Sequence, residues 1–151
     1  MSSLIALLVM KLFNTLGRTL TDFDPPIGSP VGIYVCGPTV QTKPHVGHGR
    51  AAVAFDVLRR YLLWRGFDVT YVQNITDVDD KIINASIEQG VPTDEVAAAA
   101  ATAFRQGYEA LGVMAPDLEP KATEHVPAMI TMIDQLITKG HAYESGGDVY
   151  F

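Results

Sequence analysis

Two histidines near the end of the first third of the chain could do chemistry together. His45 and His48 flank Gly47, so on the first turn of a helix both imidazoles would share one face beside a bare stretch of backbone. Pro44 fixes the backbone before them, and an amphipathic pattern follows as far as Gly66. Backbone N–H groups at a helix start are unpaired and favour negative charge, so this turn predicts a site for a triphosphate.

A short apolar strand is expected to position this turn. Residues 31–35 are rich in β-branched side chains and lack polar alternation, which predicts a strand buried on both faces. Cys36 ends that run, and a Gly-Pro loop leads to the histidines. Taken alone, a strand, a loop and a helix also fit an ordinary α/β connection, and a lone cysteine on such a strand is usually a small buried hydrophobe.

A second strand is expected over residues 68–76, after a helix of suitable length. These elements predict a βαβ unit with parallel strands, which is half of a nucleotide-binding fold. Ligands of such sheets lie beyond the carboxyl ends of the strands, so Cys36 and the end of the second strand should share a rim with the histidines. Asp77, Asp79 and Asp80 could hold magnesium there, although bonding of local backbone N–H groups explains them at least as well.

The rest of the chain has a mainly helical pattern. The helix after the histidines should bury Ala54, Val57, Leu58, Tyr61 and Leu62, with its arginines mostly elsewhere and Gly66 as C-cap. Further helices are expected from Lys81 and over 96–111, the latter with Thr93 as N-cap. A last helix is expected over 122–139, with an apolar stripe packed on the domain. Residues 112–120 should be a loop, and residues 142–151 should form a hairpin around Ser-Gly-Gly. His125 and His141 lack ligand partners at metal spacing, which favours solvated or cap-adjacent side chains.

Composition indicates one ordinary globular domain. The chain has 151 residues, 48% of them hydrophobic, which is enough to build a core. A net charge of -6 argues against a surface that grips nucleic acid indiscriminately. One cysteine forms no internal disulfide, consistent with the cytoplasm. The apolar start is far shorter than the roughly 20 residues that span a bilayer, so no membrane association is expected, and residues 1–10 are interpreted as an extension, with Met10 an alternative start.

Three separated segments resemble the cysteine-specific family of class I aminoacyl-tRNA synthetases. They are residues 34–40, residues 38–48 with Val46 in place of the isoleucine of the His-Ile-Gly-His signature, and residues 74–81. The resemblance covers residues 11–151. It implies an α/β fold, the first half of a Rossmann-like parallel-sheet nucleotide-binding domain with a helical extension. Residues 11–112 would be the first half of the catalytic domain and 113–151 the start of the insertion between its halves.

The resemblance also implies a function. The full-length enzyme would activate cysteine with ATP and Mg²⁺ and transfer it to tRNA(Cys), as a cytoplasmic monomer. His45 and His48 would be catalytic, and both would bind ATP together with Gly37, Pro38, Thr39, Val40 and Gly47. Cys36 matches a ligand of a Zn²⁺ ion, one per full-length chain, that binds the substrate thiol, and Thr76 matches a threonine of the amino-acid pocket. The sequence lacks Lys-Met-Ser-Lys-Ser and a second cysteine, so an N-terminal fragment, inactive alone, is expected.

Two other functions remain open from the residues. The cysteine ligase of mycothiol biosynthesis shares the adenylation chemistry and passes cysteine to an amino sugar, although its loop departs from the Cys-Gly-Pro-Thr-Val form seen here. A non-catalytic nucleotide-binding module would use the same strand, loop and helix. Residues 41–44 also depart from the aromatic-acidic version common in synthetases, which leaves the local nucleotide contacts open.

Overall fold

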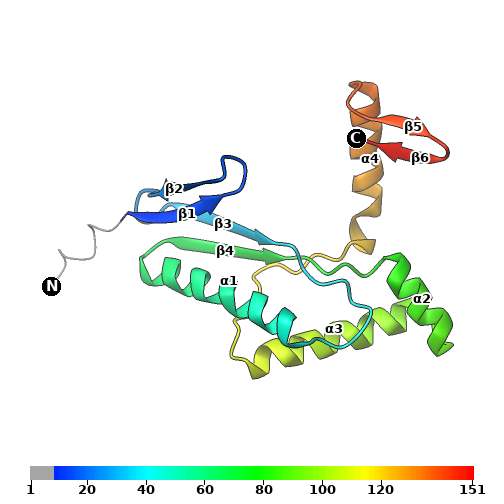
Figure 1. The fold of residues 1–151 in the computed structure, drawn as a ribbon, viewed down its shortest axis with the longest axis horizontal. Helices are drawn as coiled ribbons and strands as arrows, with labels where there is room; N and C mark the ends of the chain where they lie inside the picture. The colour runs from blue at the N-terminus through cyan, green and yellow to red at the C-terminus, as the bar shows by residue number, and fades with distance from the viewer. Residues whose placement is uncertain (1–8) are drawn as a thin grey trace.

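A computed structural model describes residues 9–151, and Figure 1 shows its ribbon. The predicted extension therefore lies almost wholly outside the described residues. The elements are β1 Met10–Asn14, β2 Thr19–Phe23, β3 Pro30–Val35, α1 Val46–Trp64, β4 Asp68–Gln73, α2 Asp80–Gln89, α3 Thr93–Ala110, the short 3-10 helix η2 Thr123–His125, α4 Val126–Thr138, β5 Tyr143–Ser145 and β6 Asp148–Tyr150. None of the described helices is long and apolar enough to cross a membrane.

The predicted βαβ unit is confirmed. β3 and β4 are parallel, with a register from Pro30 opposite Asp68 to Val35 opposite Gln73, and α1 connects them. β4 ends at Gln73, earlier than predicted, because the chain beyond it keeps only isolated bridges. α1 has Arg65 as its C-cap, one residue before the glycine that we expected there.

β3 is buried on one face only, so the prediction of burial on both faces is wrong. Val31 and Val35 are buried and pack toward the helix side, whereas Tyr34, which points to the other face, is 65% exposed. The cause is that α1 covers one side of the sheet (Figure 1) and no described helix packs on Tyr34. Among residues 9–151, no strand pairs with the edge of β3 opposite β4.

Residues 117–121 run parallel to β4 on its other edge, where we predicted only a loop. The N–H of Gln73 donates to Leu118 O at 3.1 Å, and the N–H of Ile75 donates to Pro120 O at 2.9 Å. Asp117 strengthens this attachment because its Oδ2 accepts from the N–H of Tyr71 at 2.6 Å. β4 is therefore an interior strand although its second neighbour is not itself a regular strand.

The buried face of α1 differs from the predicted one. Asp56 and Arg59 are buried, with exposed fractions of 9% and 5%, whereas Val57 is exposed. Arg59 tolerates burial because its guanidinium donates to Ala115 O at 2.7 Å and to Asp117 Oδ1 at 2.8 Å. The prediction that the arginines of this helix lie away from the core is thus wrong for Arg59.

α2 and α3 form a second core with the loop after β3. Val40 and Ile82 are fully buried there, and they pack with Phe104 and the small residues of α3. Alanines at three of the inward positions of α3, Ala97, Ala100 and Ala101, let the helices approach closely, so the Ala-rich run serves packing as well as helix propensity. α3 begins at Thr93, as its first residue, and its N-cap is Pro92, one residue earlier than predicted.

The C-terminal unit, which consists of η2, α4 and the hairpin of β5 and β6, projects from the sheet on the side opposite α1 (Figure 1). α4 has no buried residue, and Met129, Ile130 and Ile133 on it are at least one-third exposed. The prediction that its apolar stripe packs on the domain is therefore wrong for the described residues. The predicted terminal hairpin is confirmed, with β5 and β6 pairing from Tyr143 opposite Tyr150 to Ser145 opposite Asp148.

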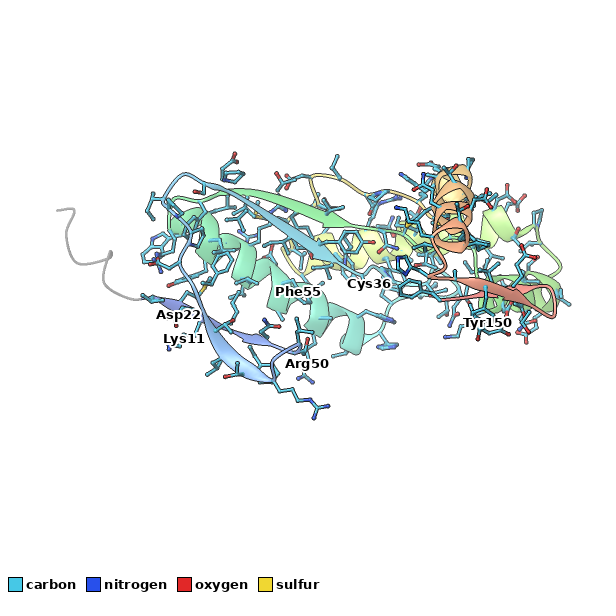
Figure 2. All side chains as sticks on the ribbon, turned by 90° about the horizontal axis from the view of Figure 1, so that it is seen from above. Lys11, Asp22, Cys36, Arg50, Phe55 and Tyr150 are labelled. Carbon is cyan, nitrogen blue, oxygen red and sulfur yellow. The ribbon has the colours of Figure 1, made fainter. Side chains whose placement is uncertain are left out.

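A hairpin near the N-terminus was not predicted. β1 and β2 pair antiparallel from Met10 opposite Phe23, and an ion pair of 3.0 Å joins Lys11 to Asp22 across the strands (Figure 2). Phe23 contacts Phe67 edge to face, and this contact attaches the hairpin to the core cluster formed by Val31, Leu62, Phe67 and Val69. In the sequence of this hairpin, apolar and polar residues alternate only over a short and irregular stretch, so the pattern did not predict strands.

Candidate functional site

The two predicted histidines cap the N-terminus of α1. His45 is the N-cap, and its Nδ1 accepts from the N–H of Gly47 at 3.1 Å. His48 completes a capping box because its Nδ1 accepts from the N–H of His45 at 3.2 Å. The rings lie together, with centroids 3.9 Å apart. A Cβ at position 47 would lie 2.9 Å from the His45 ring, so glycine permits this close packing.

This arrangement changes the expected chemistry of the helix start. We predicted several unpaired backbone N–H groups, but the histidine side chains already accept from two of them. A neutral imidazole whose Nδ1 accepts must carry its proton on Nε2. His45 and His48 therefore each present an Nε2–H donor, and the donors available to a ligand come largely from side chains.

His48 is held neutral by its surroundings. It is partly buried and contacts Phe104 of α3 edge to face, with ring centroids 4.9 Å apart. Burial lowers the pKa of His48 below its ordinary value, and the neighbouring His45 lowers it further. Near neutral pH this ring can donate a hydrogen bond without carrying a charge.

Acid should weaken the start of α1. Protonation puts hydrogen on Nδ1 of His48, which then no longer accepts from the His45 N–H. Because the pKa in the folded chain lies below the unfolded value of 6.5, this contribution to stability is complete above that value and is lost as the pH falls through the folded pKa. We expect urea unfolding between about pH 7 and about pH 5 to show a steeper loss of stability in the wild type than in His48→Asn, in which the acceptor at position 48 does not titrate. Equal slopes would contradict this role.

Hydrogen bonds join the loop after β3 to the segment after β4. The N–H of Val40 donates to Thr76 O and the N–H of Thr76 donates to Pro38 O, both at 3.2 Å. Asn74 Oδ1 accepts from the N–H of Gly37 at 2.8 Å, and its amide donates to Thr76 Oγ1 at 3.3 Å. The structure thus brings the predicted loop and Thr76 together. It adds Asn74, whose place directly after a parallel strand was the signal that could have found it.

Gly37 is required where the two segments meet. A Cβ at this position would lie 1.5 Å from the backbone oxygen of Asn74. We expect Gly37→Ala to destabilise the 151-residue chain by about 1–3 kcal/mol, as overpacking does, measured by urea unfolding. Gly32→Ala in β3 is the matched control, since a Cβ there meets nothing within 4 Å. Equal losses in both variants would show that strand propensity, and not the contact with Asn74, is responsible.

Cys36 lies at the end of β3 and is exposed (Figure 2). The alternative that it is a small buried hydrophobe is therefore wrong. Zinc sites need three or four protein donors, and residues 9–151 contain no group of three His, Cys, Asp or Glu that could hold a metal ion. Cys36 fits as a single accessible sulfur ligand, but the described residues alone do not form a zinc site.

The aspartates after β4 have structural partners. Asp79 is the N-cap of α2 and accepts from the N–H of Lys81 at 2.9 Å. Asp77 accepts from the N–H and the hydroxyl of Thr123 at 3.0 and 2.6 Å. Burial raises the pKa of Asp77, but these bonds outweigh it and leave the pKa below its usual value. Local hydrogen bonding, the second of the two explanations, accounts for both side chains.

The other two histidines lie on the C-terminal unit. His125 ends η2, and its Nδ1 lies 2.8 Å from Lys121 O. His141 is exposed just after α4, and its N–H donates to Leu136 O. Both positions are cap-adjacent, as the sequence indicated.

Solved structures share this fold. The chain resembles Mycobacterium tuberculosis methionyl-tRNA synthetase in complex with methionyl-adenylate, with a TM-score of 0.70 and 24% identity over 76% of this chain and 23% of that one. A second structure of the M. tuberculosis enzyme, bound by methionyl-adenylate, gives a TM-score of 0.66 and 23% identity over 79% of this chain and 23% of that one. The chain thus shares its α/β fold with the matching part of these two structures.

Sequence comparison identifies the family to which the chain belongs. The model of the family described as "tRNA synthetases class I (C) catalytic domain" matches residues 23–151, so the chain belongs to this family. Cysteine–tRNA ligase of Streptomyces griseus subsp. griseus is 48% identical to it over 144 residues, which is 95% of this chain. The chain spans 31% of the length of that relative.

Proposed function

We propose that this chain is the part of a cysteine–tRNA ligase that binds ATP and cysteine. The observation that carries the proposal is the pair of capping imidazoles, each with its Nε2–H free, at the helix start that follows the first parallel strand. The 48% identity to a cysteine–tRNA ligase supports the substrate assignment. Residues 11–112 would belong to the first half of the catalytic domain and 113–151 to the start of the insertion.

In the proposed reaction, a carboxylate oxygen of cysteine attacks the α-phosphorus of ATP. The bond to the bridging oxygen breaks, and pyrophosphate leaves. Mg²⁺, when bound to ATP, would neutralise part of the phosphate charge. The chain supplies no nucleophile and acts by positioning and by donating hydrogen bonds. His45 and His48 would donate from Nε2 to phosphate oxygens, and Gly37, Pro38, Thr39, Val40 and Gly47 would line the nucleotide. A hydroxyl of the terminal ribose of tRNA(Cys) then attacks the adenylate carbonyl, and AMP leaves.

Cysteine would be bound at the ends of β3 and β4. Thr76 would line its pocket, with its hydroxyl oriented by Asn74. Cys36 would donate one thiolate to a Zn²⁺ ion whose other ligands lie outside the described residues. When bound, zinc supplies a soft acceptor that favours the cysteine thiolate over the serine hydroxyl. We also propose that the enzyme works in the cytoplasm as a monomer.

The test is amino-acid-dependent exchange of pyrophosphate into ATP, using a protein of the length of the relatives. We expect exchange with cysteine, very little with serine, and transfer to tRNA(Cys). Transfer to an amino sugar instead of tRNA would assign the chain to the mycothiol type of ligase. ATP binding without any cysteine-dependent exchange would identify a non-catalytic nucleotide-binding module.

A further inference from the structure

Asn74, the first residue after β4, joins the two segments that we assign to the cysteine substrate. Its Oδ1 accepts from the N–H of Gly37 at 2.8 Å, and its Nδ2 donates to Thr76 Oγ1 at 3.3 Å. The first bond holds the peptide that links Cys36 to Gly37. The second bond reaches the hydroxyl that we assign to the cysteine pocket, so one side chain contacts both parts of the proposed site.

The orientation of the Asn74 amide follows from its partners. A backbone N–H can only donate, so the atom that faces Gly37 must be the carbonyl oxygen of the amide. The NH₂ group then faces Thr76, and because this nitrogen cannot accept, the Thr76 oxygen must accept from it. The hydrogen of the Thr76 hydroxyl therefore points away from Asn74.

This hydroxyl hydrogen of Thr76 is not used inside the protein. Within residues 9–151, Thr76 Oγ1 accepts from Asn74 and donates to no acceptor. The backbone of Thr76 is held on both sides, since its N–H donates to Pro38 O and its O accepts from the N–H of Val40, both at 3.2 Å. Thr76 is partly exposed. A fixed, reachable residue thus keeps one donor for a guest.

Holding the two segments together does not by itself require asparagine. In an Asn74→Asp variant, carboxylate oxygens could accept from the Gly37 N–H and from the Thr76 hydroxyl, so both contacts would be kept. The Thr76 hydrogen would then point at position 74. The two side chains are equivalent as a link between the segments, but only asparagine leaves the Thr76 hydrogen free.

We propose that Asn74 is a positioning residue that directs the Thr76 hydroxyl to donate to a carboxylate oxygen of the substrate cysteine. This inference rests on the proposed function, which places Thr76 in the cysteine pocket. The ammonium group of cysteine only donates, and its sulfur is a weak acceptor, so the carboxylate oxygens are the acceptors that suit this hydroxyl. Asn74 acts through Thr76 and not on the reacting atoms.

The test is the KM for cysteine and for ATP in pyrophosphate exchange, using a protein of the length of the relatives. Asn74→Asp should raise the KM for cysteine by about two- to tenfold, the effect of one hydrogen bond, and leave the KM for ATP and the urea midpoint unchanged. Asn84→Asp adds the same charge at an exposed position of α2 and should change neither constant.

A double-mutant cycle separates the direction of the hydroxyl from the added charge. Thr76→Val removes the hydroxyl and should raise the KM for cysteine by a similar factor. Adding Asn74→Asp to Thr76→Val should cause no further rise, because no hydrogen remains to be redirected. Asn74→Ala frees the hydroxyl from its fixed direction without adding a charge, so it should raise the same constant and serves if Asn74→Asp does not fold.

The results that would overturn this inference differ from those that would overturn the proposed function. Wild-type exchange with cysteine, together with an unchanged KM for cysteine in Asn74→Asp or in Asn74→Ala, would remove the positioning role and keep the proposed function. An equal rise on adding Asn74→Asp to the wild type and to Thr76→Val would show that charge alone is responsible. No cysteine-dependent exchange by the wild type would overturn the proposed function itself.

Discussion

Replacing His48 with asparagine should lower cysteine-dependent pyrophosphate exchange by about 10²–10³-fold in a protein of the length of the relatives, which is the usual effect of losing one donor to a transition-state oxygen. Asparagine Oδ1 can take the place of Nδ1 and accept from the His45 N–H, so the cap of α1 is kept. The Nε2–H donor is lost. The variant should therefore be folded and strongly impaired, and near-normal exchange would remove His48 from the mechanism.

His48→Gln is the matched variant because it should keep the donor role of Nε2–H and lose the acceptor role of Nδ1, the reverse of His48→Asn. Its amide can place an N–H near the position of Nε2, while the acceptor at Nδ1 is lost. We expect it to retain more exchange than His48→Asn and to lose about 0.5–2 kcal/mol of stability, as for a missing N-cap. His141→Asn is the control for a general effect of losing a histidine, since His141 is exposed beyond α4.

Truncating Ile82 should cause the largest loss of stability among the substitutions considered. Its side chain is 1% exposed and packs against α3, so Ile82→Ala should destabilise the 151-residue chain by about 2–5 kcal/mol. Ile83→Ala removes the same atoms from the next residue, which is 46% exposed, and should change stability much less. Urea unfolding followed by circular dichroism measures both, and similar losses would show that α2 does not pack as described.

The βαβ unit could be predicted because its signals are local. β-branched residues at 31–35, a Gly-Pro loop and a helical pattern after Pro44 each depend on neighbours in the sequence, and the parallel pairing of β3 and β4 follows from their connection. The shared face of His45 and His48 follows from helical spacing alone. That the rings would cap the helix was not foreseen, because histidine is an unusual N-cap.

The features that sequence reasoning missed depend on distant partners. Arg59 is buried only because Asp117, 58 residues later, accepts from it. The segment 117–121 has no strand pattern, and it follows β4 because strand N–H groups need acceptors. The apolar stripe of α4 indicates packing, yet Met129, Ile130 and Ile133 on it stay exposed in the described chain. A periodic pattern shows which face of a helix is apolar but not which surface meets it.

The one-sided pairing of β3 has a consequence for handling the protein. An unpaired strand edge offers a row of amide and carbonyl groups to any extended segment, and this edge lacks the inward charges that discourage such addition. A further strand, from a longer chain or from a neighbouring molecule, would turn β3 from the rim of the sheet into its interior. The isolated 151 residues therefore carry a tendency to self-associate that grows with concentration.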